Sequence, residues 1–463
     1  MDLNFASDRT NFTIRIDDFD PCVPPQWAFW KAGRMNSSNS EKASLPQRNE
    51  FWKLVFPWVL TALFLLFLPV IFASNSALTI MNQMAITIIF ALAYNMLLGQ
   101  GGMLSFGHAV YMGVGGFMCV HVMNYVEVNS APLSLPFLPI FGGLFGLGLA
   151  TLVGTFSTRS AGTVFAMISL GVGELIAACS LIIVAFFGGE EGVSADRTYM
   201  RPFFEIEFFT QIEVYYLTSV WLLISALLMY LFSRTPIGRM ANAVRDNPER
   251  AEFLGYSARW VRYYSFCASG FFCGIAGALF AINFEILTEE NLNLATSGSI
   301  LLVTFLGGVG VFFGPIIGAV LFTLLQTVLG LYTELWQLYL GALFLATVMF
   351  FPQGFAGVLV SHAPAARNGR LGSLFIPYVK MAAPSAVCLW SVAGLAELLF
   401  HARHAALGEE EMVYFGINML STSVIPWTVF GGLAVISFGI CRKVAPSVLE
   451  AWDKAITPRG MAQ

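Results

Sequence analysis

The chain has 463 residues, of which 57% are hydrophobic and only 11% are charged. A soluble domain carries about 25% charged residues, so this composition excludes an ordinary soluble enzyme or nucleic-acid-binding domain and places most of the chain in lipid. The net charge of −4 says little, because in a membrane protein the distribution of charge matters more than its sum.

Residues 1–50 are polar and mix acids with bases, and no apolar run follows a basic start. This is not the pattern of a signal peptide, so we expect a cytoplasmic tail. Beyond it, apolar runs of about 20 residues, the length of a membrane helix, recur along the chain. The predicted spans are 54–73, 77–98, 103–124, 135–157, 162–187, 213–232, 260–284, 314–332, 335–351, 382–400 and 413–440, with a shorter apolar piece at 297–309.

These spans predict an all-α polytopic membrane protein with about 10–12 transmembrane helices, some of them broken by glycine. We expect one transmembrane domain over 51–360, closed by Phe351-Pro-Gln-Gly. Residues 361–463 then form a basic linker, an additional transmembrane hairpin and a short cytoplasmic tail.

The basic residues decide the orientation, because Lys and Arg concentrate in cytoplasmic loops. With both termini in the cytoplasm, all but three of the 24 Lys and Arg lie in cytoplasmic segments or at their boundary. The three exceptions are Arg197, Arg201 and Arg403. The same orientation places acidic loops outside and the run 235–255 in the cytoplasm.

Cysteine and histidine give no sign of a metal centre. The seven cysteines are scattered without a CxxC pair and read as buried structural thiols. His401 and His404 stand alone on the external side of the predicted C-terminal hairpin. We therefore predict no metal and no catalytic residue in this chain.

The run from Thr235 to Gly255 is unusually polar for a loop between two long apolar segments. Thr235-Pro236 and Asn247-Pro248 are each typical of a helix cap followed by a first turn, and Gly255 is a stop signal. Two short amphipathic helices in this place suit docking into a groove of another protein. The alternative is a loop helix that lies on the membrane with its basic residues on lipid head groups.

Several motifs resemble the permease subunits of branched-chain amino-acid ABC importers. Arg239-x5-Arg245-Asp-Asn-Pro-Glu-Arg-Ala-x3-Gly255 is similar to the cytoplasmic coupling segment of that family. Further similar stretches run from Asn95 to His108, from Phe165 to Glu174, from Gly274 to Leu279, from Gly307 to Gly318, and from Pro352 to Gly357. The resemblance covers about 55–360 and leaves out the N-terminal tail and the C-terminal hairpin.

The resemblance implies a heterodimer with a second homologous permease, two cytoplasmic ATPase subunits, a periplasmic solute-binding protein and a place in the bacterial inner membrane. The chain contains no GxxxxGK[ST] phosphate loop, so ATP and Mg would bind partner subunits and this chain would hold no cofactor. By resemblance, the residues that couple to the ATPase are Arg239, Arg245, Asp246, Asn247, Glu249, Arg250, Leu254 and Gly255.

Candidate residues of the translocation path are Tyr94, Gly102, Ser105, His108, Ser169, Glu174, Thr304 and Gly308. Glu174 is costly in lipid and should face the interior of the bundle, either on the path or in a structural hydrogen bond. For His108, helix packing is the favoured interpretation and a pore-lining role the alternative. The glycine breaks near Gly102 and Gly308 permit tight helix crossings or, alternatively, present N–H groups to a carboxylate.

Two hypotheses follow. The first is an ABC-importer permease that moves branched-chain or other hydrophobic amino acids by alternating access, with urea, short amides or aromatic acids as alternative solutes. A loaded binding protein would then dock on external loops such as 188–192. The second is an ion-coupled carrier or membrane enzyme that works alone, with Glu174 as its proton or ion site.

Overall fold

The computed structural model describes residues 48–204, 206–404, 411–414 and 417–456. The predicted tail 1–50 lies outside these residues except for its last three, and so does the end of the predicted C-terminal tail. The chain divides into two compact units, residues 1–63 and 64–463. The described part of the first unit is the beginning of α2 (Arg48–Ile71).

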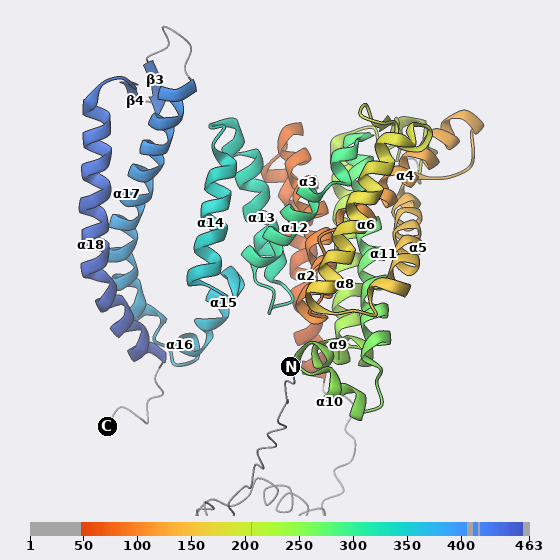
Figure 1. Cartoon of the computed structure of the whole chain (residues 1–463), viewed down its shortest axis with the longest axis horizontal. Helices are drawn as coiled ribbons and strands as arrows, with labels where there is room; N and C mark the ends of the chain where they lie inside the picture. Colours follow the sequence, from red (N-terminus) through yellow and green to blue (C-terminus); the bar gives the residue numbers. More distant parts are fainter. Residues whose placement is uncertain (1–47, 205, 405–410, 415–416, 457–463) are drawn as a thin grey trace, which may run out of the picture. The chain divides into compact units, whose positions relative to one another are not determined.

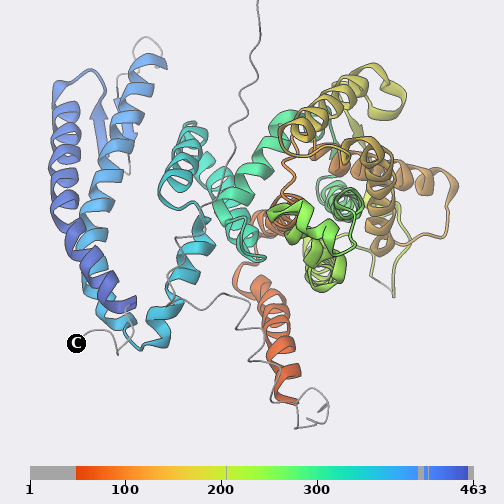
Figure 2. The same ribbon diagram turned by 60° about the horizontal axis from the view of Figure 1, so that its bottom comes forward.

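The second unit is almost entirely helical (Figures 1 and 2). Its α-helices and its π-helical turn η2 are α3 (Asn75–Asn95), η2 (Met96–Gln100), α4 (Ala109–Asn129), α5 (Leu138–Ser157), α6 (Gly162–Ile182), α7 (Val184–Phe187), α8 (Gln211–Arg234), α9 (Pro236–Asp246), α10 (Pro248–Phe253), α11 (Ala258–Phe284), α12 (Leu294–Gly307), α13 (Gly314–Thr327), α14 (Trp336–Phe350), α15 (Gly354–Ser361), α16 (Ala363–Arg367), α17 (Leu371–His404) and α18 (Val424–Ile456). Short 3-10 turns are η3 (Leu135–Phe137), η4 (Arg197–Tyr199), η5 (Glu289–Asn291) and η6 (Leu329–Leu331).

Two small antiparallel strand pairs lie in loops between helices. Strand β1 (Val193–Ser194) pairs with β2 (Ile286–Leu287), and β3 (Glu411–Tyr414) pairs with β4 (Ile417–Leu420).

Within the described residues, nine helices are long and apolar enough to cross a membrane. The bent pair Trp336–Phe350 and Gly354–Arg367, with a 46° angle, forms a tenth candidate span. Helix α2 adds a shorter apolar stretch, Val55–Ile71. The predicted all-α polytopic fold is therefore confirmed, while the cytoplasmic location of both termini stays a prediction.

Helix α11 forms the centre of the main bundle and packs along α5 and α4. Glycines allow this close approach: a Cβ on Gly274 would overlap the carbonyl oxygen of Gly142, and one on Gly277 would overlap that of Met112. Small residues let membrane helices approach this closely, because lipid supplies no hydrophobic force that drives helices together. A second close helix pair is α17 with α18, which run side by side (Figures 1 and 2).

Several predicted spans have wrong boundaries, including 382–400, which is part of the longer helix α17. The helix predicted from residue 103 begins at Ala109, because residues 101–108 form a non-helical entry that contains Gly102 at φ 64°. The helix predicted over 162–187 ends at Ile182 and is followed by the short α7. The span predicted over 413–440 starts at Val424, since the region before it forms the β3–β4 hairpin.

The β3–β4 hairpin was missed because a short apolar run does not separate strand from helix. Residues Glu411–Tyr414 alternate between exposed and buried side chains, as a half-buried strand does. The basic linker predicted from residue 361 is also more regular than expected, since α16 and the first turns of α17 occupy most of 361–381.

Candidate functional site

Helices α9 and α10 form the polar segment between α8 and α11, and local capping explains both of them. Thr235 Oγ1 accepts a hydrogen bond from the N–H of Gly238 at 3.2 Å, and Pro236 occupies the first turn. Asn247 Oδ1 accepts from the N–H of Arg250 at 3.0 Å, with Pro248 in the equivalent place. The prediction of two short capped helices is confirmed.

The apolar stripe of this segment packs on the start of α11. Ala241, Val244 and Ala251 form one buried cluster with Ala258 and Val261. This packing fixes the segment to the transmembrane helix that follows it. A displacement of α9 and α10 would therefore be transmitted to α11.

All eight residues predicted to contact an ATPase have exposed side chains or, for Gly255, an exposed backbone. The tip of the segment is apolar as well, with Phe253 90% exposed and Leu254 66% exposed. An exposed phenylalanine beside charged residues is typical of a helix that inserts into a partner's groove. Sequence reasoning selected Leu254 but missed Phe253.

Arg245 also connects this segment to the break between α3 and α4. Its Nη1 donates a hydrogen bond to the carbonyl oxygen of Gly99, and its Nε donates to Asp246 Oδ1 at 3.0 Å. Its aliphatic chain covers Gly102, where a Cβ would lie 2.6 Å from Arg245 Cγ. Gly102 has φ 64°, so this position favours glycine for two independent reasons.

The two glycine breaks predicted from sequence meet at this point. A Cβ on Gly99 would lie only 2.6 Å from the carbonyl oxygen of Val309, so the two backbones are in direct contact. Gly308 has φ 115°, and a side chain there would overlap the carbonyl oxygen of Gln353. Arg245, the η2 turn and the α12–α13 connection therefore form one junction, made of Gly99, Gly102, Arg245, Gly308 and Val309. Below it is named the cytoplasmic junction, after the side of the membrane that the basic residues predict for it.

Five of the predicted path residues are buried within the helix packing of this chain: Tyr94, Ser105, His108, Ser169 and Thr304. Tyr94 donates to the carbonyl oxygen of Ser105 at 2.8 Å. Ser169 Oγ accepts from the N–H of Phe106 at 3.1 Å, and Thr304 Oγ1 donates to the carbonyl oxygen of Ile300 at 2.8 Å.

His108 lies at the centre of this buried group. Ser269 Oγ donates to the carbonyl oxygen of Ala93 at 2.5 Å and lies 2.8 Å from His108 Nε2. Because the hydroxyl hydrogen points to Ala93, the tautomer with its proton on Nε2 fits this pair, and Nδ1 has no hydrogen-bond partner among the described residues. The ring is fully buried among Phe90, Tyr94 and Tyr111, as the helix-packing interpretation requires.

Glu174 does not face the interior of this chain's own helix bundle, whereas its place in an assembled importer stays a prediction. Its side chain is exposed on α6, whereas Phe165, Ser169 and Gly173 form the buried face of the same helix. A carboxylate exposed to lipid is still energetically unfavourable, and a side chain or surface of another subunit can shield it. The sequence predicted that Glu174 needs shielding but could not say which chain supplies it.

The loops that were predicted to be external are held by Arg197. Its guanidinium donates to the carbonyl oxygens of Phe208 and Ile282 at 3.2 and 3.1 Å, and it pairs with Glu285 at 3.4 Å. Next to it, the hydroxyl and N–H of Thr198 donate to Asp196 and lower the pKa of that carboxyl. The predicted docking loop 188–192 is closed on itself, since a Cβ on Gly188 would overlap the backbone of Gly192.

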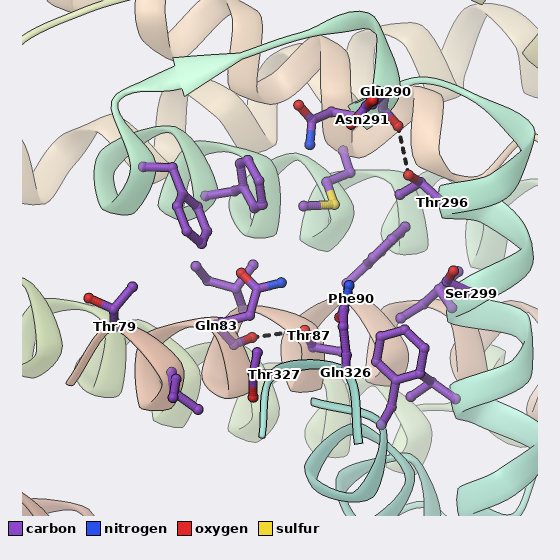
Figure 3. A pocket seen from close by; sticks show the side chains of 18 residues that line it. Thr79, Gln83, Thr87, Phe90, Glu290, Asn291, Thr296, Ser299, Gln326 and Thr327 are labelled. Carbon is purple, nitrogen blue, oxygen red and sulfur yellow. Dashed lines mark hydrogen bonds between the residues drawn. The ribbon is translucent and has the colours of Figure 1, made fainter. Parts of the chain in front are cut away.

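A cavity of about 430 Å³ lies between α3, α11, α12 and α13, and sequence reasoning did not find it (Figure 3). None of the predicted path residues lines it. Its walls combine aromatic rings, among them Phe90 and Phe280, with the amides of Gln83, Asn291 and Gln326. These residues come from four separate parts of the sequence, so no local motif marks them.

Comparison with known proteins gives these features a context. The family described as "branched-chain amino acid transport system / permease component" matches residues 76–349, more than half of the chain. The chain belongs to this permease family.

The high-affinity branched-chain amino acid transport system permease protein LivM of Escherichia coli is 27% identical to this permease over 302 residues, which cover 61% of the chain and 70% of LivM. LivM of Salmonella typhimurium matches to the same extent. The autoinducer 2 import system permease protein LsrC of Klebsiella pneumoniae is 30% identical over 159 residues, or 32% of the chain and 46% of LsrC. No solved structure matches the permease.

The family match covers the cytoplasmic junction, α9–α10 and all but one of the predicted spans before residue 349. It ends before α15 and therefore does not include the α17–α18 hairpin. Both the motifs read from the sequence and the family comparison thus identify the same central part of the permease.

Proposed function

We propose that this chain is one of two permease subunits of an ATP-driven importer that carries branched-chain or other hydrophobic amino acids across the bacterial inner membrane. The observation that carries the proposal is the cytoplasmic junction. There, the exposed α9–α10 segment is joined through Arg245 to the backbone of the η2 turn, at its contact with the second glycine break.

The junction supports a coupling role for α9–α10. Their outer surface is charged and ends in exposed Phe253 and Leu254, while their inner surface packs on α11. A pair of ATPase subunits that closes on the outer surface would push α11 and, through Arg245, the glycine-broken ends of α3 and α12. Backbone breaks at such places let helices reorient without unfolding.

The second permease subunit would cover the exposed face of α6. This face carries Glu174 together with Gly171 and Ala178, all exposed in the single chain. Between two permeases the carboxylate would be shielded from lipid and would border the path through which the solute crosses by alternating access. A periplasmic binding protein would deliver the solute to the loops held by Arg197.

Hydrophobic amino acids lead as the solute because the LivM proteins are named for branched-chain amino-acid transport. The LsrC proteins are named for autoinducer 2 import, so other small solutes remain alternatives. Urea, short amides and aromatic acids are the alternatives within the importer class. An ion-coupled carrier is disfavoured, because Glu174 is the one carboxylate of α6 and no group of His, Cys, Asp and Glu among the described residues could hold a metal ion.

The test is reconstitution of the permease with its second permease, ATPase and binding-protein partners in vesicles. We expect uptake of radiolabelled leucine that needs ATP, the ATPase subunits and the binding protein together. A ligand screen by thermal shift on the binding protein would identify the preferred solute. Leucine uptake without ATP or without the ATPase subunits would refute the importer proposal and support a carrier that works alone.

A further inference from the structure

The cavity between α3, α11, α12 and α13 has the size and lining of a small-molecule site. Its volume of about 430 Å³ is within the range of roughly 300–1,000 Å³ found for ligand pockets. Part of its lining lies toward the helix ends that the charge distribution predicts to be on the external side of the membrane. Thr79 lies near the start of α3, Phe284 ends α11 and Thr327 ends α13, while Phe90 and Val303 line the deeper part of the cavity.

The hydroxyl oxygens that line the cavity can all accept a hydrogen bond from a bound molecule. Five of them donate their hydrogens to main-chain carbonyl oxygens at distances between 2.5 and 3.0 Å. They belong to Thr79, Thr87, Thr296, Ser299 and Thr327. A hydroxyl has one hydrogen and two lone pairs, so each oxygen keeps acceptor capacity for a molecule in the cavity.

Gln83 adds an acceptor that has no partner among the described residues. Its Oε1 is buried and accepts no hydrogen bond. A buried unpaired oxygen is unfavourable, and an N–H donor that enters the cavity would relieve that cost. With the Glu290 side chain also in the lining, and no Lys, Arg or His among the 18 described lining residues, the cavity favours a positively charged donor over an anion.

The cavity also contains hydrogen-bond donors. Asn291 Oδ1 accepts from the N–H of Thr288 at 3.1 Å, which leaves the NH₂ group of Asn291 available. In Figure 3 the side-chain amides of Gln83 and Gln326 rise from one wall of the cavity, and the amide of Asn291 comes from the opposite wall. Amide NH₂ groups at these places can donate to a carboxylate without adding a fixed positive charge.

The rest of the lining is apolar and aromatic. Phe280 and Phe284 lie with ring centroids 4.5 Å apart, and Phe90, Met112 and Phe322 complete this part of the wall. Such a surface accommodates a branched aliphatic side chain and gives no hydrogen bond to a sugar or polyol.

We propose that this cavity binds a small hydrophobic amino acid as its zwitterion, and that it is the first site in the permease to receive the solute. The ammonium group donates to Gln83 Oε1 and the hydroxyl oxygens, the carboxylate accepts from the amides of Asn291 and Gln326, and the side chain lies among the phenylalanine rings. The inference rests on the proposed function and names the solute chemistry that this subunit itself selects.

The test is protection of a cysteine placed in the cavity wall. The Ser299→Cys permease is assembled with its partners in vesicles, and modification by N-ethylmaleimide is read at residue 299 by mass spectrometry of its peptide. We expect leucine to slow modification, and 4-methylpentanoate, which is leucine without its amino group, to have no effect. Equal protection by the two compounds, or protection by neither, overturns the proposal.

A second substitution examines the unpaired acceptor. Adding Gln83→Leu should raise the leucine concentration that gives half protection by about tenfold or more, as expected when a charged group loses a hydrogen bond. Gln337→Leu is the matched control, because Gln337 is exposed on α14 outside the cavity and should leave protection unchanged. A wild-type protection curve for Gln83→Leu overturns the assignment of the ammonium to Gln83.

ATP-driven leucine uptake by the unmodified importer, measured in the same vesicles, separates this inference from the proposed function. Uptake without protection at residue 299 overturns the cavity proposal and leaves the importer proposal standing. Protection without uptake supports the cavity and overturns the importer proposal. If neither uptake nor protection at residue 299 is observed, the cavity proposal and the importer proposal are both overturned.

Discussion

Helices α11 and α6 are both apolar, glycine-containing membrane spans, yet this chain uses them in opposite ways. In the most apolar stretch of α11, 83% of the residues are buried inside the chain, against 28% in α6. The glycines of α11 contact neighbouring backbones, whereas Gly171 of α6 has nothing within 4 Å of the place a Cβ would occupy. Hydropathy therefore identifies a span but does not say whether its packing partner belongs to the same chain.

The largest expected effect comes from replacing a glycine of α11. Gly277→Val places methyl groups against the carbonyl oxygen of Met112 and should destabilise the purified subunit by about 3 kcal/mol or more. Thermal unfolding in detergent measures it. The matched control is Gly171→Val on α6, which should change the unfolding free energy by no more than about 0.5 kcal/mol. Equal losses of unfolding free energy in the two variants would show that α11 and α6 are packed equally tightly within the chain.

The next effect concerns the face that α6 leaves free. If a second permease covers α6 as proposed, Gly171→Trp should leave the single subunit stable but weaken this association by about tenfold or more, because an indole would separate the two surfaces. Co-purification at graded concentrations measures this. Gly148 of α5 is also exposed and has nothing within 4 Å, so Gly148→Trp serves as the control. If only the α5 variant dissociates, the partner covers α5 instead.

Two arginines of α9 and α10 also differ in whether their partners belong to this chain. Arg245 is bonded to the cytoplasmic junction, while Arg250 is exposed and no described residue accepts a hydrogen bond from its side chain. Arg245→Glu should keep the ATPase subunits bound and lower leucine transport per ATP by about tenfold. Arg250→Glu should weaken assembly with the ATPase, and excess ATPase should restore transport. Identical behaviour, or intact transport and assembly in both variants, would contradict the division of roles.

The smallest effect is expected at Glu174. Its exposed position predicts that Glu174→Gln leaves the unfolding free energy of the subunit within about 0.5 kcal/mol of the native value. In the complete importer, loss of the charge should lower uptake several-fold, with Glu127→Gln, another exposed glutamate, as the control. Unchanged uptake and affinity would remove Glu174 from the translocation path.

The features that the sequence predicted depend on neighbouring residues. Thr235 with Pro236, and Asn247 with Pro248, specify two helix starts within a few positions, and both are present in the structure. The all-α membrane fold follows from runs of apolar residues in the same way. Gly102 was correctly placed at a break, because glycine tolerates the positive φ found there.

The features that were missed depend on residues far apart in the chain. Arg245 and Gly99 are separated by 146 positions, and the cavity joins Gln83, Asn291 and Gln326. Polar residues in membrane spans were assumed to line a path, yet His108 and Ser169 are buried in the bundle and form hydrogen bonds there. A single sequence identifies which side chains need partners, and only the packing of the helices decides which partners they meet.

The bond between Arg245 and Gly99 has a consequence for how the importer can evolve. The acceptor is a main-chain carbonyl, which every residue type carries, so no substitution at position 99 removes the oxygen itself. Position 99 is restricted for another reason, since a side chain there would collide with Asn95 and Val309. If this bond couples ATP use to solute movement as proposed, substitution of the arginine is the direct way to change the strength of that coupling, because the acceptor side of the bond is the same for every residue type.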